Sequence, residues 1–223
     1  MPYRFLDDDK RFTKYQWIEL SVTKARNDAR PESYRPNLDT LKICGALSSA
    51  DNWRARREII RPLLKRSLCE IERERAANKS PTLGAFKPAK IDRLLIEDAA
   101  QPNWTTEQLN SLRQIPLFQN APQDELEKLP FDFKYQFHCA DESCTGHKLT
   151  CFDWEMGAAY RKWRREYRDR WPQAFRRTFE DGMINKNDTH FFVGNQHQAP
   201  TAWIIVGLFY PPRPKTEDLF DVQ

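Results

Sequence analysis

Cysteine and histidine side chains gather in one short segment of this chain. Cys139, Cys144 and His147 lie within nine residues, and Gly146 beside them can adopt the positive φ of a tight turn. Thiolate sulfur and imidazole nitrogen are the donors that zinc prefers. The types and spacing of these residues therefore predict a zinc ion bound in a loop between two strands.

Two residues compete for the fourth position on the ion. Cys151 would complete a compact set with the ligand order of a zinc knuckle but not its spacing. His197 lies farther along the chain, at the expected tip of the last hairpin, and can fold back over the loop. His138 is the weakest candidate, because it should point away from the strand face that Cys139 occupies. The residues leave Cys151 and His197 as alternatives.

Four protein ligands would close the site and leave no position for water, which favours a structural ion over a catalytic one. Asp153 and Glu155 follow the cluster and, with a histidine, offer a hydrolytic alternative. Their positions also suit a helix cap and a first-turn acid. The chain contains no glycine-rich phosphate loop, nucleophile elbow or His-Glu-x-x-His segment. We therefore assign no catalytic residue, and keep a metal-dependent nuclease or hydrolase as the alternative.

A basic, aromatic helix is expected directly after the cluster. At helical spacing one stripe is aromatic or apolar and is expected to face the core: Met156, Tyr160, Trp163, Tyr167 and Trp171. A second face carries four arginines: Arg161, Arg164, Arg165 and Arg168.

Arginine forks bind phosphate oxygens in pairs, and we expect no acid to balance the second face. We therefore predict that this face binds nucleic acid, either DNA or RNA. Trp154 lies off the apolar stripe and near the arginines, so it is the residue we expect to stack on a base.

Composition sets limits on the class of protein. The net charge is +4 and the pI about 8.8, a mild basic bias. The first residues, MPYRFLDDDKRF, lack the apolar segment of a signal peptide, so we expect none, and no apolar run approaches the ~18 residues of a membrane span. Five cysteines, an odd number, favour reduced thiols in the cytoplasm. The proline-rich tail PPRPKTEDLF offers a docking peptide for a protein partner.

The spacing of apolar residues predicts the strands and helices that would position the candidate ligands and the arginines. Strict alternation predicts a strand over 131–139, with the aromatic residues and Cys139 on its buried face. The other elements expected in the second half are a strand at 147–152, helices at 153–170 and 172–182, and strands at 190–195 and 202–209. Those expected in the first half are strands at 14–25, 40–47 and 91–96, a long helix at 51–77 interrupted at Pro62, and a short helix at 107–114.

Short connections between these elements favour an α+β fold, with an antiparallel sheet, packed helices and a zinc-stapled β-hairpin in the C-terminal half. Changes in composition suggest three regions: 1–80, with strands and a helix; 81–130, which connects; and 131–223, an α+β module around the zinc loop. The three can also form one continuous domain.

Roughly the last ninety residues show a joint pattern: F-x-Y-x-F-x-C, then C-x-G-H-x5-D-W-E, then F-F-V-G-N-Q-H and a strand ending in Tyr-Pro-Pro. This pattern resembles a family of uncharacterised bacterial proteins. The resemblance implies a bacterial origin and groups Cys139, Cys144, His147 and His197 as one ligand set; it implies no activity. We expect a zinc-stabilised nucleic-acid-binding accessory protein, or alternatively a subunit that contacts other proteins in a larger complex.

Overall fold

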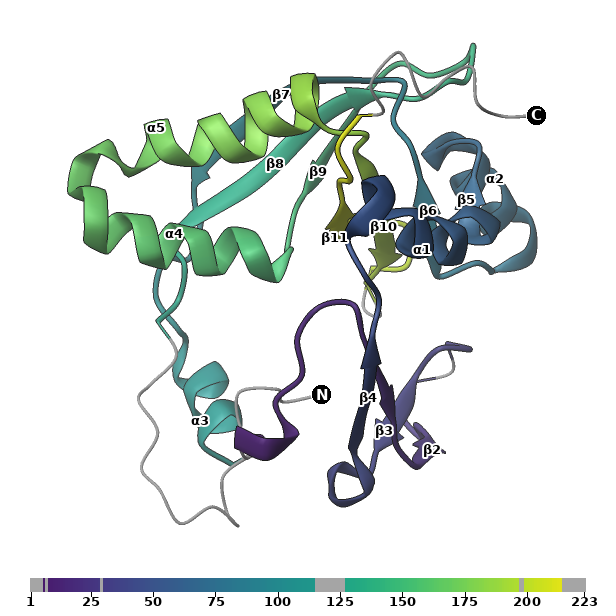
Figure 1. Cartoon of the computed structure of the whole chain (residues 1–223), viewed down its shortest axis with the longest axis vertical. Helices are drawn as coiled ribbons and strands as arrows, with labels where there is room; N and C mark the ends of the chain where they lie inside the picture. The colour runs from purple at the N-terminus through teal and green to yellow at the C-terminus, as the bar shows by residue number, and fades with distance from the viewer. Residues whose placement is uncertain (1–5, 7, 29, 115–126, 197–198, 214–223) are drawn as a thin grey trace.

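A computed structural model describes residues 6, 8–28, 30–114, 127–196 and 199–213 of the chain. These residues form helices and mostly antiparallel sheets, which confirms the α+β class (Figure 1). No helix in the described ranges has both the length and the apolar character needed to cross a membrane.

Strands and helices alternate irregularly along the chain. The strands are β1 (Gln16–Glu19), β2 (Val22–Lys24), β3 (Tyr34–Pro36), β4 (Lys42–Ala46), β5 (Leu64–Lys65), β6 (Leu83–Phe86), β7 (Lys90–Asp98), β8 (Phe131–His138), β9 (His147–Thr150), β10 (His190–Asn195) and β11 (Trp203–Phe209). The helices are α1 (Ala50–Ile60), α2 (Leu68–Asn78), α3 (Thr106–Gln114), α4 (Trp154–Tyr167) and α5 (Trp171–Arg176), which continues into the wider π-helical segment η6 (Arg177–Lys186).

Two sheets form the centre of the molecule. One has the order β7-β8-β9 and is antiparallel; the other has the order β11-β10-β6-β5, with only the β5–β6 pair parallel. A single bridge between Cys151 and Ile205 joins the continuation of β9 to β11, so the two sheets meet at their edges. In Figure 1, α4 and α5 lie as an antiparallel pair beside β8, while α1 and α2 lie near β5 and β6.

The alternation expected in β8 is confirmed. Phe133, Tyr135 and Phe137 are buried, and Cys139 at the end of the same face is only 7% exposed. Phe133 stacks on Phe175 of α5, with ring centroids 4.4 Å apart. Aromatic packing therefore fixes α5 against β8. The buried side chains of Phe137 and Cys139 place the end of that strand in the core.

The apolar stripe of α4 is only partly buried. Met156, Tyr160 and Trp171 lie in the core, but Tyr167 is 43% exposed, so its assignment to the core was wrong. The cause is a break in the helix: α4 ends at Tyr167, and Arg168 takes a φ of 50°. The expected helix 153–170 therefore stops early, and Trp171 starts a new helix with a new direction.

Several boundaries in the first half also differ from expectation. The strand expected at 14–25 is two strands, β1 and β2, which pair with β4 and β3 respectively. β3 lies between the strands expected at 14–25 and 40–47, where no strand was expected. The helix expected at 51–77 is α1 and α2, separated by a 3-10 turn at Pro62 and by β5. Proline lacks the N–H that a continuous helix needs, so the two helices separate at that residue.

The expected end of the helix at Gly182 was also wrong. The segment η6 runs on to Lys186, and the N–H of Asn187 bonds to the carbonyl of Gly182 five residues back. This wider turn lets Gly182 stay within the helix instead of ending it.

Candidate metal centre

Three cysteines and one histidine converge at one end of the β7-β8-β9 sheet. The ligand atoms of Cys69, Cys139, Cys144 and His147 all lie within 4.8 Å of one another. Four donors around a tetrahedral zinc ion lie about 3.7 Å apart, given Zn–S bonds of about 2.3 Å. The cluster is therefore close to the size of such a site, and these four side chains can hold a metal ion.

The β8–β9 hairpin presents three of the donors. Cys139 follows β8, His147 opens β9, and the turn between them is held by Asp141, which accepts hydrogen bonds from the backbone N–H and the hydroxyl of Ser143. The backbone N–H of Cys144 donates to the carbonyl of Asp141 at 2.9 Å. These bonds fold the loop back so that the thiol of Cys144 approaches that of Cys139.

Gly146 completes this turn, as its position in the sequence predicts. Its φ is +95°, and a Cβ atom there would come within 2.9 Å of the His138 ring. A side chain is excluded by both the backbone conformation and the space. His138 itself bonds to Asp92 at 2.9 Å and contributes no donor to the cluster, as expected.

Helix α2 supplies the fourth donor. The buried Ser67 caps the helix by accepting a hydrogen bond from the N–H of Glu70 at 3.0 Å, which fixes the first turn and Cys69 within it. The Cys69 sulfur lies 3.2 Å from Nε2 of His147. Arg73, one turn later, pairs with Asp141 in the loop at 2.7 Å, so the helix and the loop are also joined by an ion pair.

Burial and the short distances between the three thiols make it unfavourable for all three to be deprotonated at the same time. Burial, with the nearby thiols of Cys139 and Cys144, raises the pKa of Cys69 to about 12. Burial also raises the pKa of Cys139, although the N–H groups of Leu68 and Cys69 act in the opposite direction. A divalent cation would relieve this repulsion, because it stabilises the deprotonated form of every thiol around it.

Cys144 and His147 are closer to the protonation states that bind a metal, which are the thiolate and the neutral imidazole. Burial raises the pKa of Cys144, but hydrogen bonds from the N–H groups of Cys139 and Gly146 outweigh it, so the pKa lies below its ordinary value of 9.0. Burial lowers the pKa of His147 below 6.5. His147 is therefore neutral at pH 7, which leaves a ring nitrogen free to bind a metal.

The structure thus brings together three of the residues singled out in the sequence, Cys139, Cys144 and His147. Cys151, the alternative fourth ligand, does not join them: it is buried in the core, where its N–H donates to the carbonyl of Phe133. His197, the other alternative, lies outside the described residues.

Cys69 was not among the ligands predicted from the sequence. It lies seventy residues before Cys139, inside a pattern typical of an ordinary amphipathic helix. The one signal in the sequence was the segment Ser67-Leu68-Cys69-Glu70, which places a cysteine in the first turn of a capped helix. Capping residues predict where a helix begins, but they do not indicate which hairpin its first turn contacts.

The two carboxylates of the hydrolytic alternative point elsewhere. Asp153 caps α4 through the N–H of Glu155 at 2.7 Å and accepts the N–H of Leu208 at 2.8 Å. Glu155 accepts hydrogen bonds from Lys14 at 3.1 Å and from the Tyr210 hydroxyl at 2.7 Å. Neither carboxylate belongs to the metal-ligating group found among the described residues.

Two of the four arginines on the predicted face contact other residues, and two do not form ion pairs within the described part of the chain. Arg161 donates to the carbonyl of Glu127 at 2.8 Å, and Arg164 pairs with Asp169 at 2.9 Å. The expectation that no acid balances this face was wrong for these two, because the Glu127 carboxylate lies 3.8 Å from Nε of Arg161 and Asp169 follows the end of α4. Arg165 and Arg168 are exposed and form no ion pair with any described residue. Trp154, also predicted to bind nucleic acid, is 63% exposed at the start of α4.

A hollow of about 640 Å³ lies between α4 and α5, and Arg165 and Arg168 are not among the residues that line it. Two aromatic residues, Trp163 and Tyr167, line it together with Arg170 and Arg177. Both of these further arginines are exposed. The break in the chain at Arg168 opens this hollow, since it turns α5 back alongside α4.

Fold and centre together define an α+β protein with a three-cysteine, one-histidine cluster built by a helix and a β-hairpin. The chain belongs to the family described as domain of unknown function DUF8757, whose model matches residues 64–223. Residues 1–62 match a second family model, domain of unknown function DUF8758. No curated protein and no solved structure matches the chain. The division into 1–80, 81–130 and 131–223 stays a prediction.

Proposed function

We propose that this chain is a zinc-stabilised nucleic-acid-binding protein, in which the ion is structural. The donor set supports this role, because three thiolates and one imidazole would fill a tetrahedral zinc ion completely. The ion would join α2 to the β8–β9 hairpin. No ligand position would remain for a reacting water, so the centre offers less support to the hydrolytic alternative.

The nucleic-acid surface we propose is the arginine surface, defined as Arg165 at the end of α4, Arg168 and Arg170 in the 3-10 turn that follows, and Arg177 at the start of η6. The observation that carries it is the hollow in which Arg170 and Arg177 border Trp163 and exposed Tyr167. Guanidinium groups bind phosphate oxygens, and an exposed aromatic ring can stack on a base, so this combination suits a single strand of DNA or RNA.

Other parts of the proposal follow from the chemistry of the chain. The five cysteines are all free in the structure, so we infer a reducing compartment such as the cytoplasm. A bacterial origin and a role as the accessory subunit of a larger complex belong to the same proposal. They rest on the sequence resemblance and on the proline-rich tail.

Replacing Arg165, Arg168 and Arg170 together with glutamine tests this proposal. We expect the affinity for a labelled single-stranded oligonucleotide at low salt to fall at least about tenfold, because each arginine neutralises one phosphate. The slope of log affinity against log salt should fall by about 0.7 for each phosphate that is no longer neutralised on a single strand. Fluorescence anisotropy over a salt series measures both quantities.

A matched control changes three exposed arginines elsewhere on the chain, Arg35, Arg61 and Arg66, to glutamine. It removes the same charge, so it separates a local surface from a general effect of net charge. An equal fall in affinity in the two triple variants, or no oligonucleotide binding by the wild-type protein at low salt, would contradict the proposal.

A further inference from the structure

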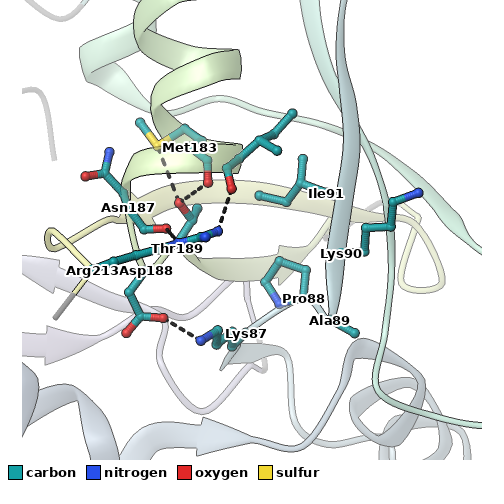
Figure 2. Close-up of a pocket in the computed structure, with 11 residues that line it drawn as sticks. Lys87, Pro88, Ala89, Lys90, Ile91, Met183, Asn187, Asp188, Thr189 and Arg213 are labelled. Atoms are coloured by element: carbon teal, nitrogen blue, oxygen red, sulfur yellow. Dashed lines mark hydrogen bonds and ion pairs between the residues drawn. The ribbon is translucent and has the colours of Figure 1, made fainter. Parts of the chain in front are cut away.

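A second hollow, of about 620 Å³, lies where the connection from β6 to β7 meets the end of η6 and the start of β10 (Figure 2). It shares no lining residue with the metal centre or the arginine surface. Its floor contains the buried side chains of Pro88, Ile91 and Met183. This volume lies within the ~300–1,000 Å³ typical of pockets that bind small organic molecules.

Cationic side chains surround this apolar floor. Lys87, Lys90 and Arg213 line the hollow, and Asp188 is the single carboxylate among the lining residues. Figure 2 shows Lys87 facing Asp188, with Nζ and Oδ1 2.6 Å apart. Arg57 also pairs with Asp188 at 2.6 Å. The negative charge of Asp188 is therefore already compensated by two cations.

Arg213 is held in place without being neutralised. Its Nε donates to the carbonyl of Asn187 at 3.2 Å, and its Nη2 donates to the carbonyl of Ile184 at 2.5 Å (Figure 2). It forms no ion pair with a carboxylate among the described residues. Carbonyl oxygens fix the orientation of a guanidinium but do not cancel its charge, so Arg213 remains able to bind an anion.

We propose that this hollow, which we call the β6–β7 pocket, binds a small organic phosphate with a flat apolar body, of the size of a nucleoside monophosphate. The phosphate would lie against Arg213. Lys87 and Lys90, which pair with Asp188 at 2.6 Å and with Asp92 at 2.8 Å, would stand at the rim. The ring would lie on Pro88, Ile91 and Met183.

Calorimetric titration of the full-length protein with adenosine monophosphate tests the pocket. We expect binding, with an affinity that falls about tenfold or more in Arg213→Gln, because the variant cannot form the charge-assisted hydrogen bond. Arg93→Gln is the matched control: it removes the same charge from an exposed position on β7 outside the hollow, and its affinity should equal that of the wild type. Adenosine and inorganic phosphate should each bind more weakly than the monophosphate, since each lacks one half of the ligand.

A second measurement does not depend on any variant. In methyl NMR spectra of the wild-type protein, adenosine monophosphate should shift the signals of Ile91 and Met183. If Arg213→Gln fails to fold by circular dichroism, Lys90→Gln takes its place, with an expected loss of about threefold in affinity. Unshifted floor methyls would overturn the inference. So would an affinity that depends on Arg165 and Arg168 instead of Arg213, since the nucleotide would then bind the arginine surface.

Discussion

Cys69 is the residue on which the candidate metal centre most depends, because it is the donor that joins a separate element, α2, to the hairpin. Cys139, Cys144 and His147 were predictable, since they lie within nine residues and the alternation of β8 orients the first of them. Cys69 was not predictable in the same way. Its approach to His147 follows from how α2 packs on the sheet, and a single sequence does not encode that contact locally.

Cys69→Ser should therefore abolish metal binding. Purified wild-type protein is expected to contain about one zinc ion per chain by elemental analysis, and Cys69→Ser close to none, because a hydroxyl is a much weaker zinc ligand than a thiolate. Cys44→Ser is the control, since Cys44 is exposed and lies outside the cluster. Cys151→Ala should also keep its metal. A full zinc content in Cys69→Ser would show that another residue completes the site.

At the level of elements, the second half of the chain was the more predictable. Strands β8, β10 and β11 lie within one residue of their expected ends, because each is a run of alternating or continuous apolar residues bounded by turn residues. The failures occurred where one residue redirects the chain. The positive φ of Arg168 splits the expected helix after Tyr167, and the strand expected at 14–25 changes partner between β1 and β2. The spacing of apolar residues in the sequence indicates neither the break in the helix nor the change of strand partner.

The turn of the β8–β9 hairpin gives a test at this scale. Gly146→Ala should destabilise the protein by about 1–3 kcal/mol, because alanine is strained at a φ of +95° and its Cβ would meet the His138 ring. Gly45→Ala is the control, since a Cβ atom there would have no neighbour within 4 Å. Urea unfolding measures both changes. Equal stability of Gly146→Ala and the wild type would mean that the turn tolerates a side chain.

At the scale of the whole molecule, residues 64–223 and residues 1–62, which match different family models, contact each other through ion pairs, hydrogen bonds and aromatic rings. Lys14 reaches Glu155 at 3.1 Å and the carbonyl of Leu208 at 3.0 Å, and Arg57 reaches Asp188 at 2.6 Å. Edge-to-face rings continue this contact, with Trp53 packed against Phe209 at 5.7 Å. These contacts also give a physical reason for the Asp-Trp-Glu and Tyr-Pro-Pro motifs, which lie at this boundary. The sequence pattern identified the motifs but not their partner, because the partner lies more than a hundred residues away.

Asp188 makes this attachment depend on pH. Burial raises its pKa, but Lys87 and Arg57 outweigh that effect, so the folded pKa lies below the ordinary 3.8. A group with a lowered folded pKa stabilises the protein above its unfolded pKa, and this contribution disappears as the pH falls through the folded pKa. Asp188→Asn should therefore cost about 1–3 kcal/mol at pH 7, and the difference from the wild type should vanish in strong acid.

Chemical unfolding of both proteins at several pH values measures this difference. Asp98→Asn is the control, because Asp98 is exposed and forms no ion pair among the described residues. A cost that stays constant from neutral to acidic pH would show that the charge of Asp188 is not what stabilises the contact.

The place of Cys69 in the chain has a topological consequence. An ion bound by Cys69 and Cys139 would cross-link two points seventy residues apart, and β6 and β7 would lie inside the closed loop. A cross-link of this span restricts the denatured ensemble by an entropy worth about 4 kcal/mol, a large share of the ~5–15 kcal/mol that holds a typical domain together. Removing the ion with a chelator would therefore loosen both central sheets, and not only the hairpin that carries most of the donors.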